Sequence, residues 1–160
     1  MRLDEKHPLN QLVLRYLEDR KRIRFNPEPI IYPDNHSDPY IKAGSHPEIV
    51  ERLWDNLGSS LPVDCRALVY GTPALVHPVL GVVFALGYGT AYAIRIPNES
   101  IQEALVVGCM RELKWSDGEK TLIEEELGKD WVFGSWAAEE KQWLAQVYFS
   151  LSDSDSGVSV

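Results

Sequence analysis

The sequence predicts an α+β fold, in which an antiparallel sheet of three to four strands carries helices packed on one face and an N-terminal helical arm. Three observations favour this class. Apolar residues recur at helical spacing in several separate segments. The stretch from Ala67 to Ile94 contains no Asp, Glu, Lys or Arg and is interrupted by glycine and proline, which is typical of buried strands joined by turns. Hydrophobic residues make up 44% of the 160 residues, enough to build a core.

The N-terminal region, residues 1–44, is predicted to hold a helix and a proline-rich crossing segment. The helix extends from about Leu9 to Arg22, because apolar residues repeat along it at i, i+3, i+4, i+7 and i+8. Prolines then follow at short intervals and restrict the residues before them: Pro27, Pro29, Pro33 and Pro39. We therefore expect residues 26–44 to form an irregular crossing or a linker to the main domain.

The main domain, residues 45–151, is predicted to begin with a capped helix. Ser45 and Glu48 fit a capping box, in which each side chain bonds the backbone amide of the other residue. An apolar stripe follows, and Gly58 stands where a helix typically ends.

The uncharged stretch is predicted to form the central strands. Residues 66–70 and 79–86 are expected to be buried strands, and residues 91–96 are expected to return antiparallel after a turn at Gly87 to Thr90. Val83, in the middle of this sheet, is predicted to be fully buried.

After the sheet, the sequence predicts a buried helix from Ile101 to about Leu113, because its residues are apolar nearly all round. Leu105 in this helix is predicted to be fully buried. A short acidic helix to Leu127, a strand at residues 131–136 and a final helix at residues 137–150 follow. Residues 152–160 are low in complexity and are predicted to be a disordered tail.

The charge excludes some classes of partner. The chain has 16 basic and 24 acidic residues, a net charge of −8 and a pI near 5.0. Proteins that coat nucleic acid or an anionic membrane present a basic face, so neither partner is expected. Residues 81–160 hold six of the basic and 13 of the acidic residues, so most of the negative charge lies there. The first residues lack the apolar core of a signal peptide, and we expect a soluble, cytoplasmic protein.

The residues that could act as metal ligands or catalytic groups stand in sequence contexts that favour structural roles. Asp34, His36 and Asp38, with His46 beyond them, could supply oxygen and nitrogen ligands, but such residues beside prolines are also ordinary turn residues. Cys65 and Cys109 are far apart, lie in apolar segments and form no C-x-x-C motif, which favours small buried side chains. We therefore predict no metal, no cofactor and no catalytic residue, and favour a protein that is not an enzyme.

The aromatic residues of the acidic half suggest the main functional hypothesis. Trp and Tyr dominate the residues that anchor protein interfaces, and nearby carboxylates steer a basic partner toward them. The sequence therefore predicts a non-enzymatic protein-binding module, an acidic neutralising or docking protein of the immunity type for a basic partner. The predicted partner-binding residues are Trp131, Trp136, Trp143, Glu139 and Glu140.

Two alternatives remain open. The first is a small-ligand-binding domain or minor enzyme, with a pocket between the sheet and the buried helix near His77, Tyr92 and Arg95. The second is a structural subunit that forms a homodimer. A deep pocket lined by His77 or Arg95 would favour the ligand, whereas a flat exposed patch of tryptophans beside Glu139 and Glu140 would favour the protein partner.

Overall fold

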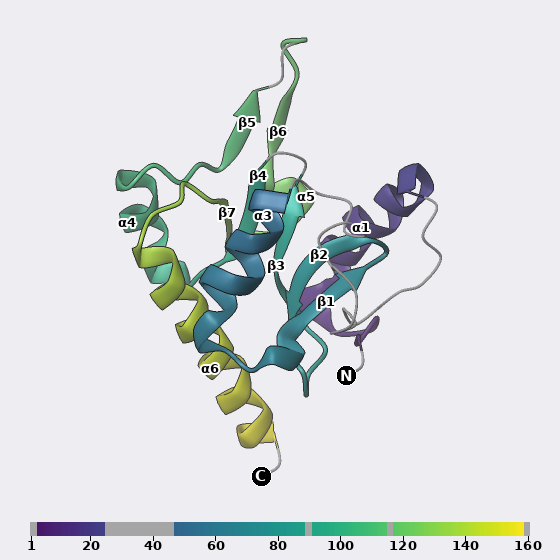
Figure 1. Cartoon of the computed structure of the whole chain (residues 1–160), viewed down its shortest axis with the longest axis vertical. Coiled ribbons are helices and arrows are strands. Elements are labelled where there is room, and N and C mark those ends of the chain that lie inside the picture. Colours follow the sequence, from purple (N-terminus) through teal and green to yellow (C-terminus); the bar gives the residue numbers. More distant parts are fainter. Residues whose placement is uncertain (1–2, 25–46, 89–90, 115–116, 159–160) are drawn as a thin grey trace.

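The computed structural model describes the backbone of residues 3–24, 47–88, 91–114 and 117–158, and the side chains of these ranges except 20–24 and 154–158. It is an α+β fold around an antiparallel sheet (Figure 1). The sheet has five strands in the order β1-β2-β3-β4-β7, rather than the predicted three to four. Their bounds are β1 Arg66–Val69, β2 Thr72–Val76, β3 Val83–Tyr88, β4 Ala91–Arg95 and β7 Trp131–Phe133.

The extra strand in the middle of the sheet is β2, which the sequence did not predict. Pro73 lies in it, and proline is normally confined to edge strands, strand starts and bulges because it lacks an N–H donor. Here Pro73 is the second residue of the strand and pairs with Leu68 of β1. The predicted hairpin around residues 87–90 is confirmed: β3 and β4 pair antiparallel, with Tyr88 opposite Ala91.

Helices cover both faces of the sheet, which corrects the prediction of a single covered face. One apolar cluster joins β-strand residues to α1 (Gln11–Arg24) and α5 (Ile123–Glu126). The other joins the alternate strand residues to the helical run at residues 47–60 and to α6 (Glu139–Val158). The physical reason is that successive side chains of a strand point to opposite faces. Ala67, Leu68 and Val69 are all buried, so both faces need cover.

The helical run at residues 47–60 changes its winding twice. It begins as α3 (Pro47–Glu51), widens to a π-helical turn η2 (Arg52–Asn56) and tightens to the 3₁₀ turn η3 (Leu57–Ser60). Residues 45 and 46, with half of the predicted capping box, lie outside the described residues. Three further short 3₁₀ turns are η1 Pro8–Asn10, η4 Val63–Cys65 and η5 Asn98–Ser100.

The N-terminal helix α1 packs on the sheet: Val13 and Leu17 are fully buried in the cluster of that face. The proline-rich segment and the predicted boundary at residue 44 lie outside the described residues, so the domain division stays a prediction. The final helix α6 is longer than predicted and ends at Val158.

The segment after β4 departs most from prediction. Helix α4 covers only Ile101–Val106, and Gly108, with φ at +102°, lies directly beyond it. Val83 is fully buried as predicted, but Leu105 is 38% exposed, so that prediction is wrong. The chain then forms a two-stranded hairpin, β5 (Glu112–Lys114) and β6 (Lys120–Leu122), which projects from the body (Figure 1). Within the described ranges, no helix is long and apolar enough to cross a membrane.

Candidate functional site

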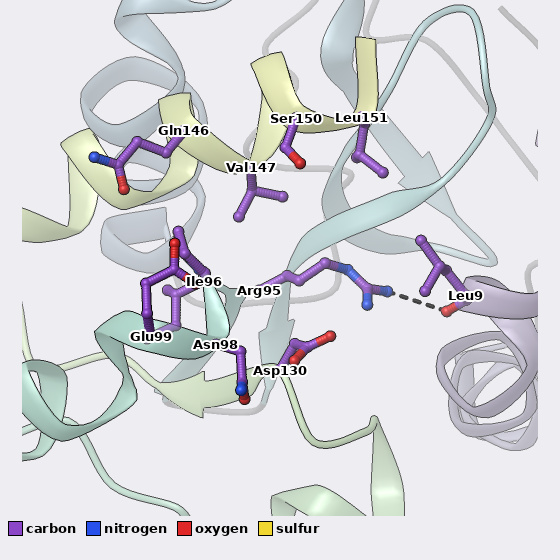
Figure 2. A pocket seen from close by; sticks show the side chains of 11 residues that line it. Leu9, Arg95, Ile96, Asn98, Glu99, Asp130, Gln146, Val147, Ser150 and Leu151 are labelled. Atoms are coloured by element: carbon purple, nitrogen blue, oxygen red, sulfur yellow. Dashed lines mark hydrogen bonds between the residues drawn. The ribbon is translucent and has the colours of Figure 1, made fainter. Parts of the chain in front are cut away.

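A pocket of about 450 Å³ lies where β4 ends, beside α6 and the turn η1 (Figure 2). Its floor contains Arg95, the last residue of β4, and Asp130, which directly precedes β7. The remaining lining residues come from η1, the segment after β4, and α6: Leu9, Ile96, Pro97, Asn98, Glu99, Gln146, Val147, Ser150 and Leu151. The volume falls within the range of roughly 300–1,000 Å³ typical of small-molecule sites.

Arg95 is the buried cation of this pocket, with only 6% of its surface exposed. Its Nη2 donates to the backbone carbonyl oxygens of Leu9, at 3.0 Å, and Val83, at 3.2 Å (Figure 2 shows the first). Its buried Nε has no hydrogen-bond partner among the described residues, and the guanidinium lies 4.9 Å from the centre of the Trp131 ring. Among the described residues no carboxylate forms an ion pair with it.

The charge of Arg95 persists at neutral pH. Burial lowers the pKa of Arg95 to about 10, and the nearby Asp130 carboxylate opposes that decrease. A pKa of about 10 keeps the guanidinium protonated near pH 7. The pocket therefore holds a positive charge whose partners in the described chain are backbone carbonyls and an aromatic ring.

Two carboxylates share the pocket with Arg95. Asp130 is half-buried, and its position is fixed because its backbone carbonyl accepts the amide of Ile96 at 2.8 Å. Glu99 is exposed and lies on the short turn η5 (Figure 2). In the part of the chain that the structure describes, neither carboxylate forms an ion pair with a basic residue.

His77 does not line this pocket. Its Nδ1 accepts the backbone amides of Val79, at 3.2 Å, and Leu80, at 3.1 Å, so this nitrogen carries no proton. Its Nε2 then donates to Ser152 Oγ at 2.9 Å, and the ring stacks on Tyr148. His77 therefore holds the turn after β2 against α6, and the ligand-binding role predicted for it stays a prediction.

Tyr92 also lies away from the pocket, in a second buried polar cluster. We call this cluster the Glu140 network; its members are Arg52, Tyr92, Cys109, Ser135, Trp136 and Glu140. Arg52 Nη2 lies 3.1 Å from Glu140 Oε1, and the Tyr92 hydroxyl donates to the same oxygen. Burial, together with the Glu140 carboxylate, raises the pKa of Tyr92, so the hydroxyl keeps the proton that it donates.

The other oxygen of Glu140 binds the segment before α6. Oε2 accepts the Ser135 amide at 2.7 Å, the Ser135 hydroxyl at 3.2 Å and the Cys109 thiol at 3.4 Å. Burial raises the pKa of Cys109 to about 11, so at neutral pH the sulfur is a thiol donor rather than a nucleophilic thiolate. The network thus fixes the first turn of α6 to the sheet and to the residues that precede the helix.

The predicted partner-binding patch is not assembled as one surface. Trp131, Trp143 and Glu140 are buried in the core or in the Glu140 network. Trp136 is 51% exposed, and Glu139, three residues later in the sequence, is half-buried. Trp131 and Trp143 are buried rather than exposed because a large aromatic side chain fills a core as readily as it anchors an interface.

Trp136 is held in an unusual backbone conformation. Its φ is +65°, which is strained for a residue with a side chain. Its amide donates to the Tyr92 hydroxyl at 2.9 Å, and its ring packs edge-on against Tyr92 and lies over the Arg52 guanidinium. These contacts place the exposed ring against Tyr92 and Arg52, two other members of the Glu140 network.

The predicted turn ligands Asp34, His36, Asp38 and His46 lie outside the described residues. Within the residues that the structure does describe, no three or more His, Cys, Asp or Glu side chains are grouped to hold a metal ion. No known protein family, curated protein or solved structure matches the chain.

The sequence pointed to Arg95 as a candidate site residue. It did not point to Asp130 and Glu99, which line the same pocket, or to Arg52, the cation of the Glu140 network. Asp130 precedes a three-residue strand and gave no separate signal. Arg52 interrupts the apolar stripe of a helix, and a buried arginine at such a position signals a buried carboxylate partner, which here is Glu140.

Proposed function

We propose that this protein is a binding domain for a small organic molecule with an anionic group, which Arg95 receives in the pocket beside α6. The observation that carries the proposal is the burial of a charged arginine on the floor of that pocket, with no ion pair to a carboxylate among the described residues. Removing an ion from water costs several kcal/mol unless an opposite charge or hydrogen bonds compensate. A bound anion would supply the opposite charge, and the guanidinium geometry suits carboxylate and phosphate groups.

The backbone supports this role because it fixes the orientation of the guanidinium before a ligand binds. The carbonyls of Leu9 and Val83 hold Nη2, and the Trp131 ring supports one face of the group. An arginine positioned in this way loses less conformational freedom when it binds an anion.

The first test removes the charge on the pocket floor. We expect Arg95→Gln to weaken the binding of small carboxylates at least about tenfold, a loss of about 1.4 kcal/mol, measured by ligand-observed NMR titration. The matched control is Arg66→Gln, because Arg66 is a partly exposed arginine that pairs with Asp55 away from the pocket. Unchanged affinity in a folded Arg95→Gln protein would contradict the proposal.

A second pair of variants covers the case in which Arg95→Gln fails to fold. Ser150 is an exposed residue of α6 that lines the pocket, so Ser150→Phe should obstruct the pocket without disturbing the core. Gln142→Phe places the same ring at an exposed position of α6 that does not line it. We expect only Ser150→Phe to abolish binding, and equal affinities for the two variants would count against the site.

A second proposal, docking of a basic protein, is supported by one specific observation. Trp136 exposes 51% of its surface, although its backbone is held in a strained conformation, and the acidic second half of the chain surrounds it in sequence. Comparative pull-down with mass spectrometry should recover a basic protein with the natural chain and lose it with Trp136→Ala. Phe149→Ala, at another exposed aromatic residue, is the control; identical recovery with both variants would oppose this proposal.

A further inference from the structure

We infer that the ligand of the Arg95 pocket is a free amino acid with an apolar side chain, whose carboxylate meets Arg95 and whose ammonium meets Asp130. This inference rests on the proposed function, because it assigns a chemical class to the same site. Three features of the pocket define the class: a buried cation, two carboxylates that form no ion pair with a described basic residue, and an apolar wall.

The two carboxylates argue against a simple anion as the ligand. Asp130 and Glu99 line the same pocket as Arg95, and neither has an ion pair with a described basic residue. A phosphate or a dicarboxylate would bring more negative charge beside them, and like charges that are close together repel. A ligand that carries one negative and one positive group neutralises Arg95 and its acidic neighbours at the same time.

Asp130 is the better placed of the two carboxylates to receive an ammonium group. It is half-buried on the pocket floor, and its backbone is fixed by the hydrogen bond from Ile96, the residue that follows Arg95. Figure 2 shows its carboxylate below the Arg95 side chain in that view. Arg95 and Asp130 interact electrostatically without forming an ion pair, so each can bind a different group of one ligand.

The wall of the pocket supplies the third feature. Val147 and Leu151 of α6 are buried side chains that line the pocket, and Leu9 of η1 lines it from the other side (Figure 2). An aliphatic group in contact with this wall would bury apolar surface, which favours binding. These residues therefore select an amino acid with an apolar side chain over a charged one.

The test compares three probes that differ only in their charged groups. L-leucine carries both groups, 4-methylpentanoate lacks the amine, and 3-methylbutylamine lacks the carboxylate. With the natural chain, isothermal titration calorimetry should show L-leucine binding at least about tenfold more tightly than either analogue, since that ratio corresponds to about one good charge-assisted contact. In Asp130→Asn, L-leucine and 4-methylpentanoate should bind within about twofold of each other.

The failures of the two proposals are distinguishable. If 4-methylpentanoate binds as tightly as L-leucine and its binding is lost in Arg95→Gln, the amino-acid inference is overturned while the anion site stands. If no probe binds in a manner that depends on Arg95, both are overturned. Lys129→Gln, next to Asp130 but absent from the pocket lining, is the control for a general change of charge, and should leave all three affinities unchanged.

Discussion

Replacing Glu140 by glutamine is expected to lower the free energy of unfolding by about 3–5 kcal/mol, the usual range for breaking one partner of a buried ion pair. Glutamine keeps the shape of the side chain but removes the charge that faces Arg52 at 3.1 Å. It also places an amide where two oxygens now accept the Tyr92 hydroxyl and the Ser135 amide. Urea denaturation followed by tryptophan fluorescence measures the change.

The adjacent residue provides the control for this substitution. Glu139 is half-buried in the same turn of α6, and Glu139→Gln should change the stability by less than about 0.5 kcal/mol. A double variant with Arg52→Gln should lose less than the sum of the two single losses, because both remove the same interaction. A loss below about 1 kcal/mol in Glu140→Gln would show that the Glu140 network does not stabilise the fold.

Replacing Gly134 by alanine is expected to cost about 3 kcal/mol or more, at the upper end of overpacking effects. A Cβ atom at this position would lie 1.9 Å from Cε2 of Tyr92, far inside contact distance. The ring has no simple way to move aside, because its hydroxyl bonds to Glu140 and to the Trp136 amide. Thermal unfolding followed by circular dichroism would detect the loss as a large fall in melting temperature.

The control for this substitution is Gly118→Ala, which separates the steric effect of an added Cβ from the backbone cost of a positive φ. Gly118 has φ at +90° and open space where a Cβ would be, so Gly118→Ala reports the conformational cost alone, about 1–2 kcal/mol. Gly134 has no positive φ, so its substitution reports the clash alone. If the two variants were equally stable, the tight packing of Tyr92 on Gly134 would not be a determinant of stability.

The parts of the fold that the sequence predicts well are those in which pattern and burial coincide. The hairpin of β3 and β4 and the burial of Val83 follow from an uncharged stretch punctuated by glycine. The prediction that Leu105 is fully buried is wrong because the apolar pattern all round this segment was taken as evidence of burial. The helix instead ends early, before the glycine at residue 108. The second covered face was also predictable, since strands that are apolar on both sides require it.

The candidate site was only partly predictable, because residues that are far apart in the sequence form it once the chain folds. Arg95 stands out in the sequence as the charge that ends an apolar strand. Asp130 meets it only because β7 pairs with β4, and that pairing brings Trp131 opposite Arg95. Likewise Glu140 and its neighbour Glu139 are identical in type, and only packing against Arg52 decides which one is buried.

Helix α6 connects the two polar sites of this molecule. Its first turn carries Glu140, and the pocket wall begins roughly 10 Å and ends roughly 16 Å farther along its axis, at 1.5 Å per residue. A helix of this length transmits a shift of one end to the other as a rigid lever. If the proposed ligand shifted α6 through Val147 and Leu151, the shift would therefore also reach the contacts of Glu140. By thermodynamic reciprocity, a substitution that loosened those contacts would then lower the affinity of the pocket for its ligand.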